Sequence, residues 1–299
     1  MKMKKRHTLM GFIAIIFWST AVAVIRSFTE NVGPITAAAA VYLLGGAVGV
    51  FILVFQSKLA SSLRSFDKRY LFICGGLFVL YMGSFYAALG MAANHSQAIE
   101  IGLINYLWPI LTVIFSILIL KTRSTILIIP GTMVAFGGIY IVTTQDHPFL
   151  WSEFISNIVT NPLVYILGLI AAISWGMYSV LSRKYGQQSQ DNVIAVFMLV
   201  TGLLLGITSL FVDEKSKWTL SGFWELLYLA ISTNLAYTFW DKAMRHGDII
   251  LVASVSYLLP FFSVLVASLY LSAPLSINLI IGAILVVIGA ILSKSSIRA

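Results

Sequence analysis

Long apolar segments alternate with short polar segments along the whole chain. A helix that crosses about 30 Å of hydrocarbon needs about 20 apolar residues, and ten segments come close to that length. Because the connections are short, consecutive helices should be antiparallel neighbours, and no connection has room for a soluble domain. The sequence therefore predicts an all-α integral membrane protein with ten transmembrane helices. These cover residues 8–28, 34–55, 70–90, 98–120, 125–144, 163–181, 193–211, 223–244, 249–271 and 276–293.

The composition supports a membrane environment. Of 299 residues, 59% are hydrophobic and 10% are charged, whereas a soluble domain carries about 25% charged residues. A soluble protein of this size cannot cover so much apolar surface with polar groups. The basic N-terminus resembles the start of a signal peptide, but no cleavage site follows, so we expect a retained first helix. The longest connection, 145–162, is expected to contain a short helix at the membrane surface.

Lysine and arginine residues determine the predicted orientation. With the N-terminus in the cytoplasm, 16 of the 19 basic residues lie on the cytoplasmic side, and only Arg26, Lys215 and Lys217 lie outside. The net charge of +8 is thus a topology signal, and we expect no nucleic-acid partner. We predict a multi-pass protein of the bacterial inner membrane, embedded in the lipid bilayer with both termini cytoplasmic.

The two halves of the chain repeat each other. Residues 11–18 match residues 168–175, and Arg26 falls on Arg183 at the same offset. Later matches include Tyr86 with Tyr237, His95 with His246, Tyr106 with Tyr257 and Pro109 with Pro260. Each half holds an odd number of helices, so the second half should insert upside down, as in secondary transporters. We predict two inverted five-helix repeats, residues 1–145 and 163–299, joined by a periplasmic connector, residues 146–162.

Three tryptophans lie away from the membrane interface that tryptophan normally occupies. Trp18, Trp108 and Trp175 fall near the middle of their predicted helices, whereas Trp151, Trp218, Trp224 and Trp240 fall near helix ends or in loops. An indole N–H needs a partner in hydrocarbon, which favours a cavity walled by these rings. Simple packing between helices is the alternative. The same wall is predicted to include Tyr81, Tyr86, Tyr106, Tyr178, Tyr237 and Tyr257.

Pro109 and Pro260 interrupt the fourth and ninth predicted helices at matching places. Each proline removes a backbone hydrogen bond and kinks its helix. The pair fits a role as gating hinges and equally fits static curvature. Asn105, one turn earlier, is a candidate either for pairing with the freed backbone or for contacting a substrate.

Charged residues inside the apolar segments are few. Glu100 lies about one turn into the fourth helix, and intramembrane acids are functional candidates, although the helix dipole also favours an acid there. Glu100, with His95 as a partner, is the candidate proton or ammonium site. Arg26 and Arg183 are expected to extend their side chains toward the membrane surface. A charged cytoplasmic cluster is expected to form a solvated loop; it comprises Asp241, Lys242, Arg245 and Asp248.

No motif of an enzyme is found in the sequence. A P-loop, a metal-ligand spacing and a nucleophile elbow are all missing. We therefore expect no catalytic residue, no cofactor and no metal site, and the protein is not expected to be an enzyme.

Several stretches resemble the EamA family of the drug/metabolite transporter superfamily, and within it the aromatic amino acid exporters. They are residues 11–20, 97–102, 105–109, 236–240, 246–247 and 271–276. The resemblance implies ten helices in two inverted repeats, export of aromatic amino acids and aromatic cations, and a central cavity lined at Trp18, Tyr106, Trp108 and Trp175. The chain departs from the family pattern at Asp241 and Lys242.

The sequence thus predicts a secondary transporter that exports aromatic amino acids from cytoplasm to periplasm by alternating access. A broad exporter of drugs or metabolites, including aromatic cations, is the nearest alternative. A passive channel is the next, although channels often use rings of charged residues, and none is found here. The oligomeric state and proton coupling are not determined by the sequence.

Overall fold

The computed structural model describes residues 2–123, 125–143, 150–271 and 277–296, and within these ranges every regular element is helical. The first half contains α1 (Lys2–Val32), α2 (Pro34–Phe55), α3 (Leu59–Ser65), the π-helical turn η1 (Tyr70–Cys74), α4 (Gly75–Gly90), α5 (His95–Asn105), α6 (Trp108–Leu120) and α7 (Ile128–Thr143). The remainder contains α8 (Trp151–Thr160), α9 (Pro162–Gly186), α10 (Ile194–Ser209), α11 (Leu220–His246), α12 (Ile249–Val255), the 3₁₀ turn η2 (Ser256–Leu258), α13 (Leu259–Leu271) and α14 (Ile277–Ser295).

Each predicted apolar segment contains at least one helix. Among the described residues, four helices are long and apolar enough to cross a membrane, and a fifth joins them if the two parts of α1, bent by 45°, form one span. Shorter apolar helices cover Ile128–Val142, Ile194–Ser209, Ile249–Ser263 and Ile280–Ser293. Large apolar side chains such as Phe72, Leu118 and Leu210 point outward and are exposed. Soluble proteins rarely expose so much apolar surface, so the all-helical fold is that of a membrane protein.

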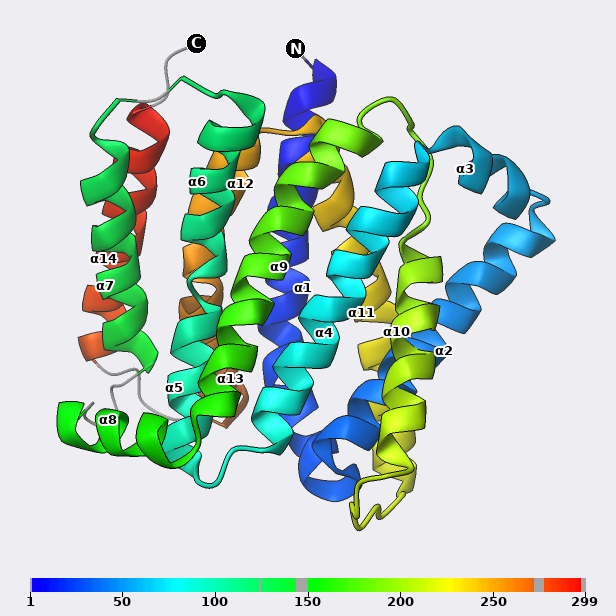
Figure 1. Cartoon of the computed structure of the whole chain (residues 1–299), viewed down its shortest axis with the longest axis horizontal. Coiled ribbons are helices and arrows are strands. Elements are labelled where there is room, and N and C mark those ends of the chain that lie inside the picture. The colour runs from blue at the N-terminus through cyan, green and yellow to red at the C-terminus, as the bar shows by residue number, and fades with distance from the viewer. Residues whose placement is uncertain (1, 124, 144–149, 272–276, 297–299) are drawn as a thin grey trace.

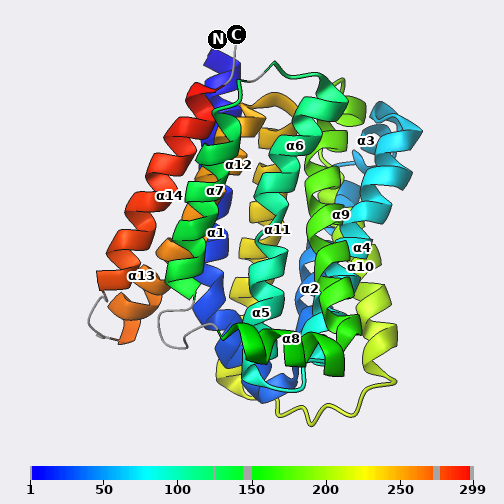
Figure 2. The same cartoon turned by 60° about the vertical axis from the view of Figure 1, so that its left-hand side comes forward.

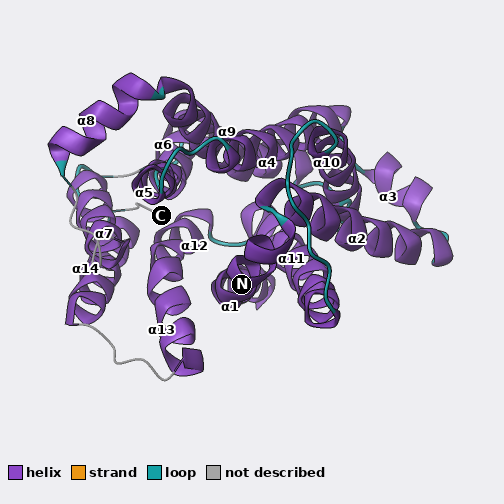
Figure 3. Ribbon diagram, turned by 90° about the horizontal axis from the view of Figure 1, so that it is seen from below, coloured by secondary structure: helices purple, strands orange, loops and turns teal. Residues whose placement is uncertain are grey.

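The long helices run up and down a single bundle (Figure 1). The most extensive contacts join α2 with α10, α7 with α14, α1 with α11 and α4 with α9. A view along the bundle shows the α7–α14 pair at one end and the α2–α10 pair at the other, with α1 and α11 between them (Figure 3). The start of α1 and the end of α14 lie at the same end of the bundle (Figure 2). We call this end the terminus side.

The connection after α7 contains the expected short helix. Helix α8 lies across the end of the bundle opposite the terminus side (Figure 1). Trp151, Ile155 and Val159 recur every four residues along it and are exposed, whereas Asn157 is buried. The connection 145–162 thus contains the short helix that was predicted, and a helix with one apolar edge turned outward suits the membrane surface. Residues 144–149 of that connection lie outside the described part.

Close contact between α2 and α10 depends on glycine. A Cβ atom on Gly202 would overlap the backbone nitrogen of Leu43, which cannot move without shifting its helix. Close approach of backbones through small residues is a general device of membrane helix packing.

We expect Gly202→Ala to lower the free energy of unfolding by about 1–3 kcal/mol, the cost of forcing an extra carbon into a packed contact. Thermal unfolding of the purified protein in detergent measures the change. Gly76→Ala is the matched control, since a Cβ there meets nothing within 4 Å. Equal stability of the two variants would contradict the packing argument.

Candidate functional site

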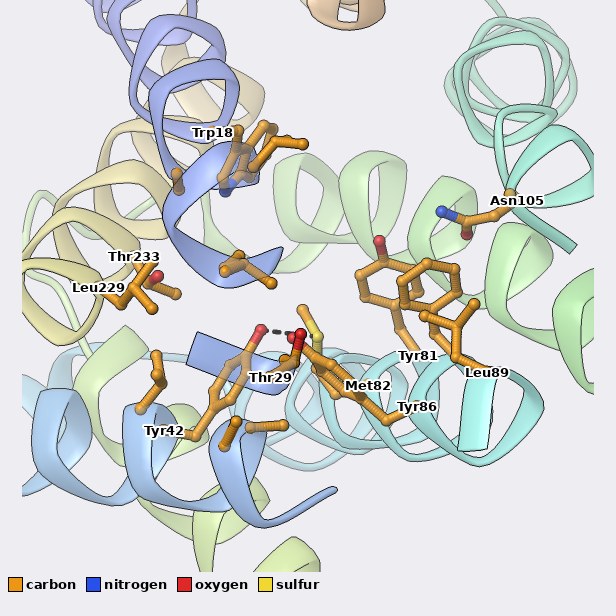
Figure 4. Close-up of a pocket in the computed structure, with 18 of the residues that line it drawn as sticks. Trp18, Thr29, Tyr42, Tyr81, Met82, Tyr86, Leu89, Asn105, Leu229 and Thr233 are labelled. Carbon is orange, nitrogen blue, oxygen red and sulfur yellow. Dashed lines mark hydrogen bonds between the residues drawn. The ribbon is translucent and has the colours of Figure 1, made fainter. Parts of the chain in front are cut away.

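A cavity of about 370 Å³ opens between α1, α2, α4, α5 and α11 (Figure 4). Its lining on α1 runs from Trp18, near mid-helix, to Thr29, near the helix end. The cavity therefore extends from the middle of the bundle away from the terminus side. Eight of the predicted binding residues line it: Trp18, Tyr81, Tyr86, Asn105, Tyr106, Trp108, Trp175 and Tyr237.

The deep wall of the cavity is a cluster of packed aromatic rings around Trp175. The ring of Trp18 lies 6.0 Å from that of Trp175 at an angle of 69°, and the ring of Tyr81 lies 4.8 Å from it. Trp108 meets Trp175 edge-on, with 6.4 Å between the ring centres and an angle of 88°. Edge-to-face pairs of this kind add about 0.5–1.5 kcal/mol each beyond the burial of their surface. The wall thus presents both faces and edges of rings.

Tyr42 and Met82 also line the cavity, and the sequence analysis did not single them out. The Tyr42 hydroxyl lies 2.7 Å from the Tyr237 hydroxyl. It also donates to the Met82 sulfur at 2.8 Å, and Figure 4 shows Tyr42 and Met82 facing each other. A signal existed in the sequence, because Tyr42 is the only tyrosine of α2 and follows the run of small residues Ala37–Ala40. These contacts tie α2, α4 and α11 together at the cavity wall.

Two predicted binding tyrosines lie outside the cavity lining. The Tyr178 hydroxyl donates to Asp241 Oδ1 at 3.1 Å, on the terminus side of the ring cluster. Tyr257 is buried in a separate apolar cluster with Leu103 and Val286.

Both predicted proline kinks coincide with breaks in helices. Pro109 is the second residue of α6, which begins after a break at Tyr106 and Leu107. Pro260 is the second residue of α13, which follows the 3₁₀ turn η2. Proline fits the first turn of a helix, where its missing N–H is not needed. Each proline therefore starts a new helix segment rather than bending a continuous one.

A buried ion pair closes the bundle on the terminus side of the rings. Arg245 Nε lies 2.7 Å from Asp241 Oδ2, and both side chains are fully buried. Tyr70, in the π-helical turn, donates its hydroxyl to Asp241 Oδ1 at 2.7 Å. The Arg245 guanidinium also donates to the carbonyl oxygens of Ser189 at 2.5 Å and Asp191 at 2.7 Å. We call Tyr70, Tyr178, Asp241 and Arg245 the latch.

The latch corrects two expectations from the sequence. Asp241 and Arg245 were expected in a solvated loop, but they lie within α11 and are 0% exposed. Trp240 was expected near the interface, but it is also 0% exposed and its ring lies 5.2 Å from those of both Trp18 and Trp108. Both errors have one cause: the charged residues near the end of α11 resemble a surface sequence, whereas partners on other elements bury them.

The two repeat-related arginines differ. Arg183 donates to the carbonyl oxygens of Met244 at 2.7 Å and Gly247 at 2.5 Å, so it caps α11 instead of reaching toward the membrane surface. Arg26 is exposed, as expected, and pairs with Glu30.

Glu100 lies apart from the cavity lining and holds α8 against the bundle. It is 4% exposed and accepts hydrogen bonds from the Tyr165 hydroxyl and from Asn157 Nδ2, the latter at 3.2 Å. Asn157 belongs to α8 and Tyr165 to α9, so the carboxylate joins three helices. His95 is the first residue of α5, and its side chain lies outside the described part.

We expect Glu100→Ala to lower the free energy of unfolding by about 1–3 kcal/mol, because it leaves buried donors of Tyr165 and Asn157 without an acceptor. Thermal unfolding measures this loss, and hydrogen exchange within α8 should quicken. Glu153→Ala is the control: it removes an exposed acid of α8 and should have little effect. If both variants behaved alike, Glu100 would not hold α8.

The chemistry of the cavity lining is aromatic and uncharged. Within the described ranges, no lining residue is an acid, a lysine, an arginine or a histidine. In the same ranges, no three His, Cys, Asp or Glu side chains come together as metal ligands. Such a space binds amphipathic molecules through ring contacts and holds a cation over ring faces.

Comparison with known proteins identifies the family. The EamA-like transporter family model matches residues 6–144 and again residues 162–294. This chain belongs to the EamA-like transporter family. The aromatic amino acid exporter YddG of Escherichia coli strain K12 is 37% identical to this EamA-like chain over 290 residues, covering 97% of each. YddG of Salmonella typhimurium strain 14028s is 36% identical over 289 residues, covering 96% of each.

A solved crystal structure has a similar fold. It superposes on this EamA-like chain with a TM-score of 0.79, at 29% sequence identity, and the match covers 97% of this chain and 98% of the other. The family, the apolar helices and the cavity agree in making the protein a membrane transporter for small molecules.

Proposed function

We propose that the protein is a secondary transporter that exports aromatic amino acids from the cytoplasm to the periplasm by alternating access. The uncharged cavity walled by Trp18, Trp108 and Trp175 carries this proposal. Its rings match an aromatic side chain, and each ring contact adds about 0.5–1.5 kcal/mol. The printed names of the relatives, aromatic amino acid exporters, agree with this substrate class.

Two inverted repeats of five helices, residues 1–145 and 163–299, would provide the alternating access. Under this proposal α1 corresponds to α9, α4 to α11 and α2 to α10. The helix contacts support the correspondence, since exchanging the halves turns the α1–α11 contact into the α9–α4 contact and leaves the α2–α10 pair unchanged. The family model also matches each half separately. A duplicated bundle of this kind can open toward either side of the membrane.

The proposed topology places the terminus side in the cytoplasm of a bacterium, with ten helices crossing its inner membrane. The basic residues support this side, because 16 of 19 fall on it. The cavity then extends toward the periplasm, while the ring cluster and the latch close the cytoplasmic side. In the proposed cycle, α5 and α12 move at the breaks before Pro109 and Pro260, and the latch separates to open the cytoplasmic side.

Uptake of labelled tryptophan into proteoliposomes tests the proposal. We expect saturable uptake that is accelerated by unlabelled tryptophan on the far side, because a carrier returns faster when loaded. Flux that neither saturates nor responds to far-side substrate would show a channel and end the proposal. A pH gradient and the variant Glu100→Gln test proton coupling in the same vesicles.

An exporter of broader range, for aromatic cations and related metabolites, is the second candidate. The uncharged aromatic cavity favours it, since ring faces attract cations without a carboxylate. Competition by an aromatic dication against labelled tryptophan separates a broad exporter, which is inhibited, from a narrow one, which is not.

A further inference from the structure

The buried polar atoms of the cavity lining differ in whether the protein supplies a hydrogen-bond partner. The Tyr42 and Tyr237 hydroxyls bond to each other. Two other lining residues each have a buried polar atom without a partner. In the described part of the chain, Trp18 Nε1 and Asn105 Oδ1 are buried and have no hydrogen-bond partner. A buried polar atom without a partner is costly, so these two atoms are candidates for contact with a ligand.

Asn105 occupies a helix end that attracts positive charge. It is the last residue of α5 and is 7% exposed. Its backbone carbonyl would normally accept from the N–H four residues later, but residue 109 is proline and has none. The carbonyl end of a helix also carries partial negative charge. The side-chain oxygen and the helix end therefore favour a donor or a cation at the same place.

The surroundings of Asn105 suit an ammonium group attached to an aromatic body. Figure 4 shows Asn105 beside Tyr81 at the cavity edge, across the space from Trp18. The Tyr81 ring lies 4.8 Å from Trp175 and so continues into the deep aromatic wall. A molecule whose polar end reaches Asn105 can thus place its ring against Trp175. An ammonium there also gains from the neighbouring ring faces.

We propose that Asn105 accepts a hydrogen bond from the α-ammonium group of the substrate while the aromatic side chain packs against the tryptophan wall. This inference rests on the proposed function and adds the group that recognises the amino-acid end. Because the acceptor is a neutral amide, selection acts on the N–H donor rather than on net charge. The carboxylate of the substrate has no charged partner among the described lining residues.

Binding of three probes that share one benzene ring tests the proposal. Phenylalanine and 2-phenylethylamine carry the ammonium, whereas 3-phenylpropionate lacks it. Quenching of the intrinsic tryptophan fluorescence of purified protein gives each Kd, since the probes contain no indole. We expect Asn105→Leu to raise the Kd of phenylalanine and of 2-phenylethylamine about tenfold or more, as expected for losing a hydrogen bond to a charged group. The Kd of 3-phenylpropionate should change less than about twofold, since that probe forms no such bond.

A second variant keeps the test decisive if Asn105→Leu does not fold. Asn105→Asp retains the shape of the side chain and adds a negative charge. It should therefore lower the Kd of the cationic 2-phenylethylamine and raise the Kd of the anionic 3-phenylpropionate. The assignment of Asn105 would be overturned if Asn105→Leu raised the Kd of all three probes equally. It would also be overturned if Asn105→Asp shifted the Kd of 2-phenylethylamine and of 3-phenylpropionate in the same direction or not at all. Failure of the wild type to transport tryptophan would overturn the proposed function instead, because the binding measurement does not require transport.

Discussion

Replacing Arg245 with leucine is expected to lower the free energy of unfolding by about 3–5 kcal/mol, the usual cost of removing one partner of a buried ion pair. Asp241 would lose its cationic partner in a site where both side chains are fully buried. The carbonyl oxygens of Ser189 and Asp191 would also lose their donor. Thermal unfolding in detergent and chemical denaturation measure the loss.

The chain offers a closely matched control for this prediction. Arg26 and Glu30 have the same spacing of four residues on a helix, but their side chains are 80% and 65% exposed. Exposed pairs contribute about 0–1 kcal/mol, so Arg26→Leu should have little effect. The double variant Asp241→Leu with Arg245→Leu should be more stable than Arg245→Leu alone, because no charge stays buried. If the latch did not stabilise the fold, Arg245→Leu would lower the free energy of unfolding no more than Arg26→Leu does.

Trp175→Ala is expected to abolish most tryptophan transport in proteoliposomes. Its ring contacts Trp18, Tyr81, Trp108 and Tyr237 at 4.8–6.4 Å between ring centres, so its loss removes the centre of the aromatic wall. A substrate ring would lose its contact with Trp175, worth about 0.5–1.5 kcal/mol, and the neighbouring rings would lose the side chain against which they pack. Initial rates at several tryptophan concentrations, normalised to folded protein, show the change as a raised KM.

Two further variants test whether an aromatic ring is needed at position 175 and whether a tryptophan outside the cavity matters. Trp175→Phe keeps an aromatic face and should retain part of the transport. Trp224→Ala removes an exposed tryptophan outside the cavity lining and should transport like the wild type. Unchanged kinetics in both Trp175→Ala and Trp108→Ala would remove these residues from the substrate site.

Features encoded in local sequence could be predicted. Apolar length indicated each helical segment, and Pro109 and Pro260 marked the two helix breaks, because proline restricts its own backbone wherever it stands. Mid-helix tryptophans indicated a cavity, and Trp18, Trp108 and Trp175 all line it.

Features that depend on distant partners could not be predicted. Asp241 is buried because Tyr70 and Tyr178, 171 and 63 residues away, supply hydroxyl donors. The residues next to Asp241 in the sequence do not indicate that these two tyrosines contact it. The role of Glu100 likewise depends on Asn157 and Tyr165, which come from helices after the middle of the chain. Pairing of this kind becomes visible only when the helices are placed together.

Among the described residues, the first half of the chain has no ion pair at the positions that correspond to the latch. At the offset that relates Pro260 to Pro109, Asp241 corresponds to Gly90 and Arg245 to Asn94, so the corresponding positions hold no ion pair. In the proposed cycle, the two conformations of the carrier would have equal energy if the halves were identical. Because only one half holds the latch, we expect the empty carrier to rest with its cavity open on the side opposite the latch. The slowest step of the proposed cycle would then be the return of the empty carrier to the conformation that opens on the latch side. Labelling of the native Cys74, which is buried in the same turn as Tyr70, tests this asymmetry without changing the latch. The asymmetry would be refuted if Cys74 reacted, without substrate, as readily as a cysteine introduced by Thr29→Cys.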